Sequence, residues 1–223
     1  MQDAASDLRF SIFYTTGITL IAGYLDAIGF RTLQGLYVSF MSGNSTRLGA
    51  ALAGSDFQTV GAGAAVILSF VFGAFVGALV FNFSGRARLA ALFACEAALV
   101  GLAATLIAGG AGFFSLLFVV VAMGMQNNAQ HTLNGAGLGK SFVTGTLFGC
   151  GRSLALWVLG KADSTAALEF AGAWLAFISG VVMGAFALDI IGLPAALSVA
   201  GVALLMFAFA ASRAGAEKDV TSG

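Results

Sequence analysis

The sequence predicts an all-α polytopic membrane protein with six transmembrane helices and two short broken or re-entrant helical segments, arranged as two inverted-topology repeats. Of the 223 residues, 59% are apolar and only 9% are charged, whereas about 25% of the residues of a soluble domain are charged. The apolar residues form eight long runs, and motifs of the first half of the chain recur in the second half. We expect a single transmembrane domain, residues 1–223, with one repeat at about 10–109 and the other at about 113–212.

The apolar runs have the length of membrane helices. The hydrocarbon core of a bilayer is about 30 Å thick and requires about 20 helical residues, and only helices or closed barrels satisfy the backbone there. These runs are too long for barrel strands; in order, they are residues 10–30, 36–54, 57–83, 89–109, 113–133, 141–160, 166–192 and 194–212. The acidic start of the chain and the lack of a small-residue cleavage site indicate that the first run is not a signal peptide.

Segments 36–54 and 141–160 are polar at their centres, and we expect them to be broken at residues 42–46 and 144–146. Suppose that each of these segments returns to the side of the membrane from which it entered, and that the N-terminus is in the cytoplasm. Of the ten basic residues, only Arg31 and Arg47 are then outside. If all eight segments cross and Arg47 and Arg152 are counted as intramembrane, the remaining basic residues divide evenly between the two sides. Because cytoplasmic loops are enriched in Lys and Arg, the pattern favours six spans with both termini in the cytoplasm.

Three stretches recur in the same order in both halves of the chain. Residues 23–35 resemble 124–135, residues 38–44 resemble 140–146, and residues 73–78 resemble 180–185. With three full spans in each half, the second half starts from the opposite side of the membrane, so the repeats are inverted. In many transporters the interrupted helices of such repeats meet near the membrane midplane and form the binding site. Alternatively, these small and hydroxyl residues are ordinary packing contacts between helices.

Polar residues at the matched positions are the predicted substrate or ion pathway. They are Asp26, Ser42, Asn44, Thr46, Arg47, Gln126, Asn127, Asn128, His131, Thr144 and Thr146. A charge at the bilayer centre costs at least about 2.5–3.5 kcal/mol, so Asp26 requires a function or a partner. One interpretation is that Asp26 couples a proton or cation, or binds a cationic group, while the amides of residues 126–128 supply neutral hydrogen bonds. The other is a structural salt bridge between Asp26 and Arg31 or Arg47.

Arg47 and His131 also have two interpretations each. Arg47 has five donors and a permanent charge, which suit a carboxylate or phosphate, and its alternative role is that of an anchor at the membrane surface. His131 follows Asn127 by four residues, on the same helical face, and either titrates near neutral pH or is a hydrogen-bonded interfacial residue. Three other acidic residues within the apolar runs, Glu96, Glu169 and Asp189, are left outside the predicted pathway.

Four motifs are fairly specific in combination: Gly23-Tyr-Leu-Asp-Ala27, Phe40-Met-Ser-Gly-Asn-Ser-Thr-Arg47, Gly124-Met-Gln-Asn127 and Val143-Thr-Gly-Thr-Leu147. Together they resemble the YoaK family of bacterial membrane proteins, a domain of unknown function. The resemblance implies a protein of roughly six spans in the inner membrane, and it implies no substrate.

The sequence predicts a secondary transporter or channel-like facilitator for a small polar solute or ion in the bacterial cytoplasmic (inner) membrane. A net charge of zero excludes nucleic-acid binding, and the absence of a GxxxxGK[ST] motif excludes ATP-driven transport by this chain alone. The alternatives are a membrane sensor or assembly partner that does not transport and, less favoured, an intramembrane enzyme, because the chain has one His and no HExxH or GxSxG motif. We expect no enzymatic activity, no cofactor and no metal. The expected partners are the lipid bilayer, the solute and a second copy in a homodimer.

Overall fold

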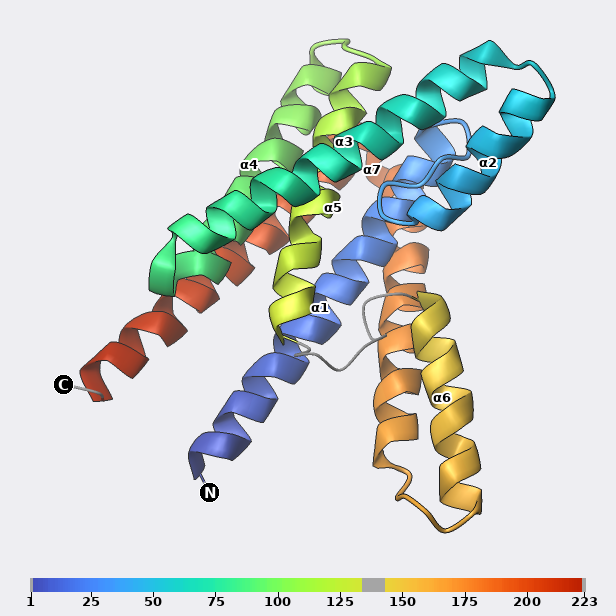
Figure 1. The fold of residues 1–223 in the computed structure, drawn as a ribbon. Coiled ribbons are helices and arrows are strands. Elements are labelled where there is room, and N and C mark those ends of the chain that lie inside the picture. Colours follow the sequence, from blue (N-terminus) through green and yellow to red (C-terminus); the bar gives the residue numbers. More distant parts are fainter. Residues whose placement is uncertain (1, 134–142, 222–223) are drawn as a thin grey trace.

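The computed structural model describes residues 2–133 and 143–221, and it describes side chains for residues 13–85, 87–129 and 143–214. All regular structure in these ranges is helical (Figure 1). The elements are α1 (Gln2–Thr32), α2 (Met41–Ala53), α3 (Phe57–Phe83), the 3-10 helix η1 (Gly85–Ala87), α4 (Arg88–Ala108), α5 (Phe113–Leu133), α6 (Val143–Val158) and α7 (Thr165–Thr221). The all-α prediction is therefore confirmed for the described part of the chain.

The helices have the surfaces of a membrane protein. In the described ranges, three stretches are long and apolar enough to cross a bilayer, namely Phe57–Phe83, Arg88–Ala108 and Thr165–Ala214, and Phe113–Ala129 is a shorter apolar helix. Large apolar side chains are exposed on these helices, for example Phe75 on α3 and Phe186 on α7, which are 60% and 62% exposed. Extensive exposed apolar surface is unfavourable in water and suits contact with lipid. The protein is therefore embedded in a membrane through its apolar helices.

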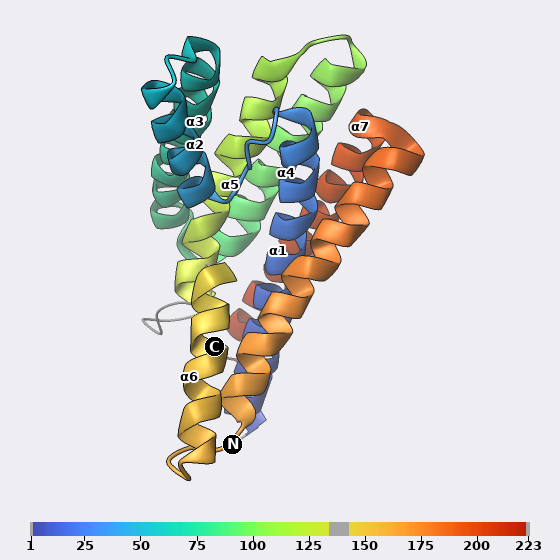
Figure 2. The same cartoon turned by 90° about the vertical axis from the view of Figure 1, so that its right-hand side faces the viewer.

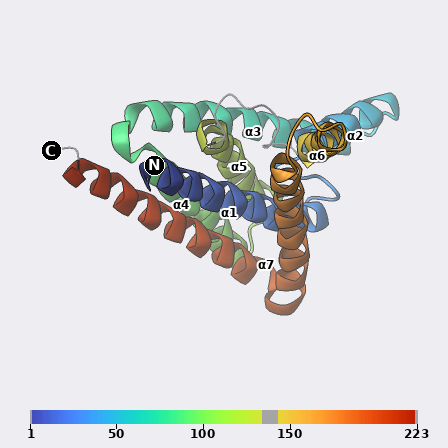
Figure 3. The ribbon, with the colours of Figure 1, turned by 90° about the horizontal axis from the view of Figure 1, so that it is seen from below.

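The last two predicted segments join into one helix with a sharp break. Inside α7, Gly192 has a φ of 75° and Pro194 follows it. Glycine adopts positive φ without steric cost and proline cannot donate the next helical hydrogen bond, so the chain changes direction here. Seen from below in Figure 3, the first arm of α7 (residues 165–191) lies beside α6, and the second arm (residues 193–221) runs along α4.

The two polar segments form short, continuous helices, so the breaks predicted at residues 42–46 and 144–146 are wrong. With 13 and 16 residues, α2 and α6 are about 20 and 24 Å long, which is less than the hydrocarbon thickness. The Thr46 and Thr146 hydroxyls donate to helix carbonyls at 3.0 and 2.7 Å, which satisfies them without interrupting the helix. The irregular backbone comes before α2, at residues 33–40. Residues 134–142, which precede α6, lie outside the described part.

Figure 2 shows how the two short helices are placed. The end of α1, the α2–α3 and α4–α5 connections and the break in α7 lie at the upper end, whereas the N-terminus and the α6–α7 connection lie at the lower end. Both α2 and α6 start near the middle of the molecule; α2 runs to the upper end and α6 to the lower end. The starts of two oppositely directed helices therefore meet in the interior.

Glycine pairs bring the longer helices together in two equivalent contacts. Gly73 and Gly77 place α3 against α5, and Gly180 and Gly184 place the first arm of α7 against α1. A Cβ atom on these glycines would meet the backbone of Val121, Met125, Leu20 and Tyr24, respectively. Both pairs thus act within the chain, as small residues do where membrane helices approach closely.

Candidate functional site

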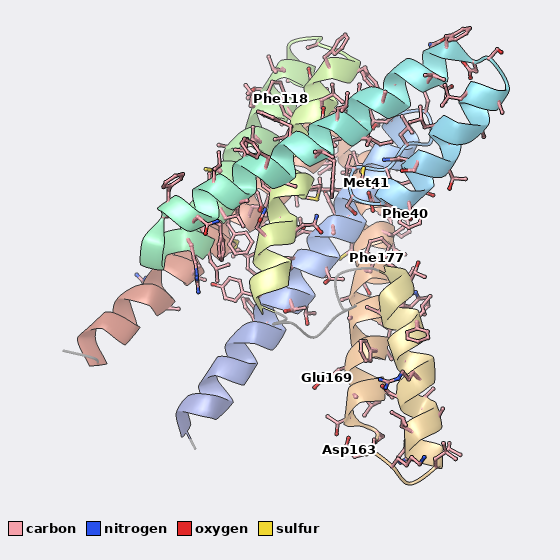
Figure 4. The ribbon with its side chains drawn as sticks, viewed as in Figure 1. Phe40, Met41, Phe118, Asp163, Glu169 and Phe177 are labelled. Atoms are coloured by element: carbon pink, nitrogen blue, oxygen red, sulfur yellow. The ribbon has the colours of Figure 1, made fainter. Side chains whose placement is uncertain are left out.

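A cavity of about 500 Å³ lies where the starts of α2 and α6 meet α1, α3, α5 and the first arm of α7. Its volume falls in the range of about 300–1,000 Å³ that is typical of small-molecule sites. The lining residues are Thr19, Ala22, Asp26, Ser39, Phe40, Met41, Ser42, Phe70, Met123, Gln126, Asn127, Val143, Thr144, Thr146, Ala173 and Phe177. Figure 4 shows Phe40 and Met41 at the start of α2 and Phe177 on α7 beside this junction.

Six of the predicted pathway residues line this cavity. They are Asp26 of α1, Ser42 of α2, Gln126 and Asn127 of α5, and Thr144 and Thr146 of α6. The helical repeat explains how α1 and α5 present several residues each. Thr19, Ala22 and Asp26 share one face of α1 at spacings of three and four, and the same spacings bring Met123, Gln126 and Asn127 together on α5. The cavity therefore combines polar groups from four helices with an aromatic and methionine-rich wall.

Asp26 holds the irregular segment before α2. Its side chain is 3% exposed, and its Oδ1 accepts hydrogen bonds from the backbone amides of Val38 and Ser39 at 2.9 and 2.7 Å. The Ser39 hydroxyl donates to Oδ2 at 2.6 Å. Of the two interpretations of Asp26, the structure excludes the salt bridge among the described residues, because Arg31 pairs with Asp189 at 2.7 Å and Arg47 donates to the Gln34 carbonyl at 2.8 Å. Asp26 thus places a carboxylate in the cavity wall and fixes the loop.

The three amides of α5 have different surroundings. Asn127 lines the cavity and donates to the Met123 carbonyl one turn earlier, at 2.9 Å. Gln126 also lines the cavity, and its Nε2 donates away from α5 to Glu96 at 3.4 Å. Asn128 is outside the lining and donates to the Ala74 and Met125 carbonyls at 3.2 and 3.1 Å, where α5 crosses α3. Two of the amides therefore face the cavity and the third bridges helices.

Three other predicted residues, Asn44, Thr46 and Arg47, are not part of the central lining. Asn44 is fully buried and exchanges hydrogen bonds with the backbone of Tyr37, which anchors the start of α2. Thr46 and Arg47 line a second, more open groove of about 390 Å³. Phe40 and Ser42 line both this groove and the central cavity, so they separate the two spaces. Arg47 is therefore outside the central lining, in a groove that adjoins the cavity at Phe40 and Ser42.

His131 lies on α5, and its side chain is outside the described part of the structure. In the ranges with described side chains, no group of three or more His, Cys, Asp or Glu residues could hold a metal ion.

Sequence reasoning missed several lining residues. Thr19 could have been found, because it lies seven residues before Asp26 on the same helical face. Ser39 lies in an irregular loop, where no periodicity predicts its direction. Glu96 was set aside, although it is fully buried on α4 and contacts the cavity residue Gln126. The signal that could have identified Glu96 was the presence of an acidic residue within an apolar run.

Comparisons with known proteins support the membrane assignment. Residues 15–210 match the family model described as "Protein of unknown function (DUF1275)". The chain is also similar to UPF0700 transmembrane protein RA0705 of Rhizobium meliloti (strain 1021), with 34% identity over 172 residues that cover 75% of this chain and 72% of the relative. No solved structure matches the chain.

Proposed function

The chain belongs to the DUF1275 family, and we propose that it moves a small polar solute across the bacterial cytoplasmic membrane through its central cavity. The family membership confirms the resemblance to the YoaK family, since YoaK is a DUF1275 member. The observation that carries the proposal is the cavity of about 500 Å³ at the meeting point of two short helices in a membrane-embedded chain. The activity is that of a secondary transporter or channel-like facilitator, without catalysis.

The transport mechanism uses six spans in two inverted repeats. The spans are α1, α3, α4, α5 and the two arms of α7. The short helices α2 and α6 do not cross the membrane: α2 belongs to a segment that enters from the upper side and returns to it, and α6 to one that enters from the lower side and returns to it. The matching contacts support this arrangement, because the glycines of α3 pack on α5 as those of α7 pack on α1. The short helix of each half also packs on the following span, α2 on α3 and α6 on α7. Movement of one half against the other then opens the cavity to each side in turn.

The basic residues support an orientation with the lower end in the cytoplasm. Lys161 lies in the α6–α7 connection at that end, which also contains the N-terminus, and Arg88 starts α4, at the end of that helix away from the upper α4–α5 connection. At the upper end, the Arg31 charge is paired with Asp189. Cytoplasmic loops of membrane proteins carry the excess of Lys and Arg. Both chain ends are therefore cytoplasmic in the proposed topology.

The lining favours a neutral or positively charged solute. Asp26 is the ionisable side chain among the described lining residues, and the other polar groups are hydroxyls and amides. An anion in this cavity would face a carboxylate with no basic side chain in the described lining to compensate it. The aromatic rings of Phe40, Phe70 and Phe177 provide faces that attract a cation. Small amines, amides and polyols are the substrate classes that this wall fits.

Flux measurements in proteoliposomes test the proposal. Vesicles with purified protein are assayed for uptake across a panel of labelled amines, amino acids, amides, polyols and organic acids, against empty vesicles. Thr144→Trp fills the cavity and should abolish uptake, whereas Ser198→Ala, on the exposed surface of α7, should retain it. If no panel member moves faster than in empty vesicles, or if Thr144→Trp transports at the wild-type rate, the proposal is wrong.

A further inference from the structure

Glu96 of α4 is a buried carboxyl whose hydrogen-bonding capacity is largely unused. The residue is 0% exposed. Its Oε2 accepts one long hydrogen bond, 3.4 Å, from Gln126 Nε2, and its Oε1 has no partner within the described part of the chain. Buried polar atoms are nearly always satisfied, so an orphaned carboxyl oxygen indicates a functional group or a missing proton, ion or water.

The surroundings of Glu96 provide no compensating charge. Its neighbours along α4 include Leu92, Phe93 and Val100, which are all fully buried in the apolar core. Helix α4 packs against α3, α5 and α7. The sequence of α3 has no titratable residue, α5 has only His131, and the described side chains of α7 include Glu169, Asp189 and Arg213. Of these α7 side chains, only Arg213 could pair with a carboxylate, and its guanidinium lies over the Phe209 ring; within the described part Glu96 forms no ion pair, and Asp189 pairs with Arg31. An isolated charge is costly in such surroundings, which favour the neutral carboxyl.

Gln126 connects this carboxyl to the cavity. It is 2% exposed, and it contributes to the cavity lining while its amide bonds to Glu96. When the amide turns toward a solute or water in the cavity, it leaves Glu96, and the carboxyl then faces a polar space. When the Gln126 amide group is flipped, its oxygen can accept a hydrogen bond from the protonated carboxyl of Glu96. Rotation of the Gln126 side chain therefore links the occupancy of the cavity to the hydrogen bonding of Glu96.

We propose that Glu96 is a proton-binding site that exchanges its proton with the cavity under the control of Gln126, and that this exchange couples solute movement to protons. The coupling rests on the proposed transport function. In the release step the O–H bond of the carboxyl breaks, its electron pair remains on the carboxylate, and the proton passes to cavity water. The uptake step is the reverse.

Asp26 does not fill this role, although it also lines the cavity. Its carboxylate accepts three hydrogen bonds, two from backbone amides and one from the Ser39 hydroxyl. These donors hold the side chain against the folded loop before α2 and favour its charged form over an unbonded one. Both oxygens of Asp26 are therefore committed to the loop, and Glu96 is the group with an uncommitted oxygen.

Infrared spectroscopy of the full chain in lipid tests the site with the deuteron as the probe. The wild type should show the C=O stretch of a protonated carboxyl, shifted on transfer to heavy water. Glu96→Gln should lose this band, whereas the control Asp26→Asn should keep it. Gln126→Leu, which removes the polar link, should retain the band and slow its shift. A band that survives in Glu96→Gln, or that exchanges equally fast in Gln126→Leu, overturns the proposal.

A vesicle assay separates coupling from transport. With a solute that the flux panel identifies, the wild type should acidify or alkalinise the vesicle interior during uptake. Glu96→Gln should lose this proton movement and still equilibrate the solute. If Glu96→Gln retains solute-driven proton movement, the coupling proposal is wrong and transport stands. If no solute is transported, the proposed function fails, and the infrared result alone decides whether Glu96 exchanges a proton with the cavity.

Discussion

Replacement of Asp26 by Ala or by Asn should separate its structural role from its charge. Asp26→Ala removes the acceptor of the Val38 and Ser39 amides, which lie 2.9 and 2.7 Å from Oδ1. A hydrogen bond to a charged group contributes about 1.5–3 kcal/mol, so the loss of two such bonds costs about 3–6 kcal/mol. Asp26→Asn keeps an oxygen for both amides, and the Ser39 hydroxyl can accept from the new amide group. With neutral bonds in place of charged ones, the cost falls to about 2 kcal/mol.

Hydrogen–deuterium exchange of the segment before α2 measures this difference. In Asp26→Ala, the amides of residues 36–40 should exchange much faster than in the wild type, and the unfolding temperature should fall. In Asp26→Asn, exchange of the same segment should accelerate much less than in Asp26→Ala. Solute uptake by the well-folded Asn variant then reports on the charge alone. Equal protection of these amides in Asp26→Ala and the wild type would show that Asp26 does not hold the loop.

Three further substitutions have defined outcomes. Gly23→Ala should destabilise the chain by about 1–3 kcal/mol in thermal unfolding, because its Cβ would meet the Phe177 carbonyl, whereas Gly172→Ala, with open space around it, should not. Arg47→Ala should leave uptake of neutral and cationic solutes unchanged, because Arg47 lies in the second groove and not in the central lining; loss of uptake with a folded protein would place it in the pathway. The Thr59 hydroxyl and amide lower the pKa of Asp56, so the stability that the wild type gains over Asp56→Asn should be present near neutral pH. It should disappear as the pH falls through the lowered pKa of Asp56, below the ordinary range of an aspartate, and an advantage that persists in acid would contradict this.

The sequence predicted the long helices well, because each is an apolar run with clear ends. Segments 57–83 and 113–133 coincide with α3 and α5. The breaks at residues 42–46 and 144–146 were wrong, since Gly, Ser and Thr are tolerated in a helix when the hydroxyls bond to preceding carbonyls. Local composition alone could not show that the irregular backbone lies at residues 33–40, before α2, and not within residues 42–46.

The candidate site was predictable where helical periodicity or the internal resemblance applied. Asp26, Gln126 and Thr146 were selected by matched position, and all three line the cavity. Arg47 was grouped with them because it follows the same motif, but the direction of α2 carries it to the second groove. The position of Ser39 depends on the loop fold, and the contact of Glu96 with Gln126 depends on how α4 packs against α5. Neither follows from sequence spacing.

Chemical blockade of the cavity tests the central claim most directly. In a chain with Cys95 and Cys150 replaced by Ala, Thr144→Cys introduces one thiol into the cavity lining, and Ser198→Cys is the matched control on the exposed surface of α7. Modification of Thr144→Cys by a thiol reagent should stop solute uptake, and excess solute should slow the modification, while modified Ser198→Cys should remain active. Uptake that continues at full rate after complete modification of Thr144→Cys would contradict a pathway through this cavity.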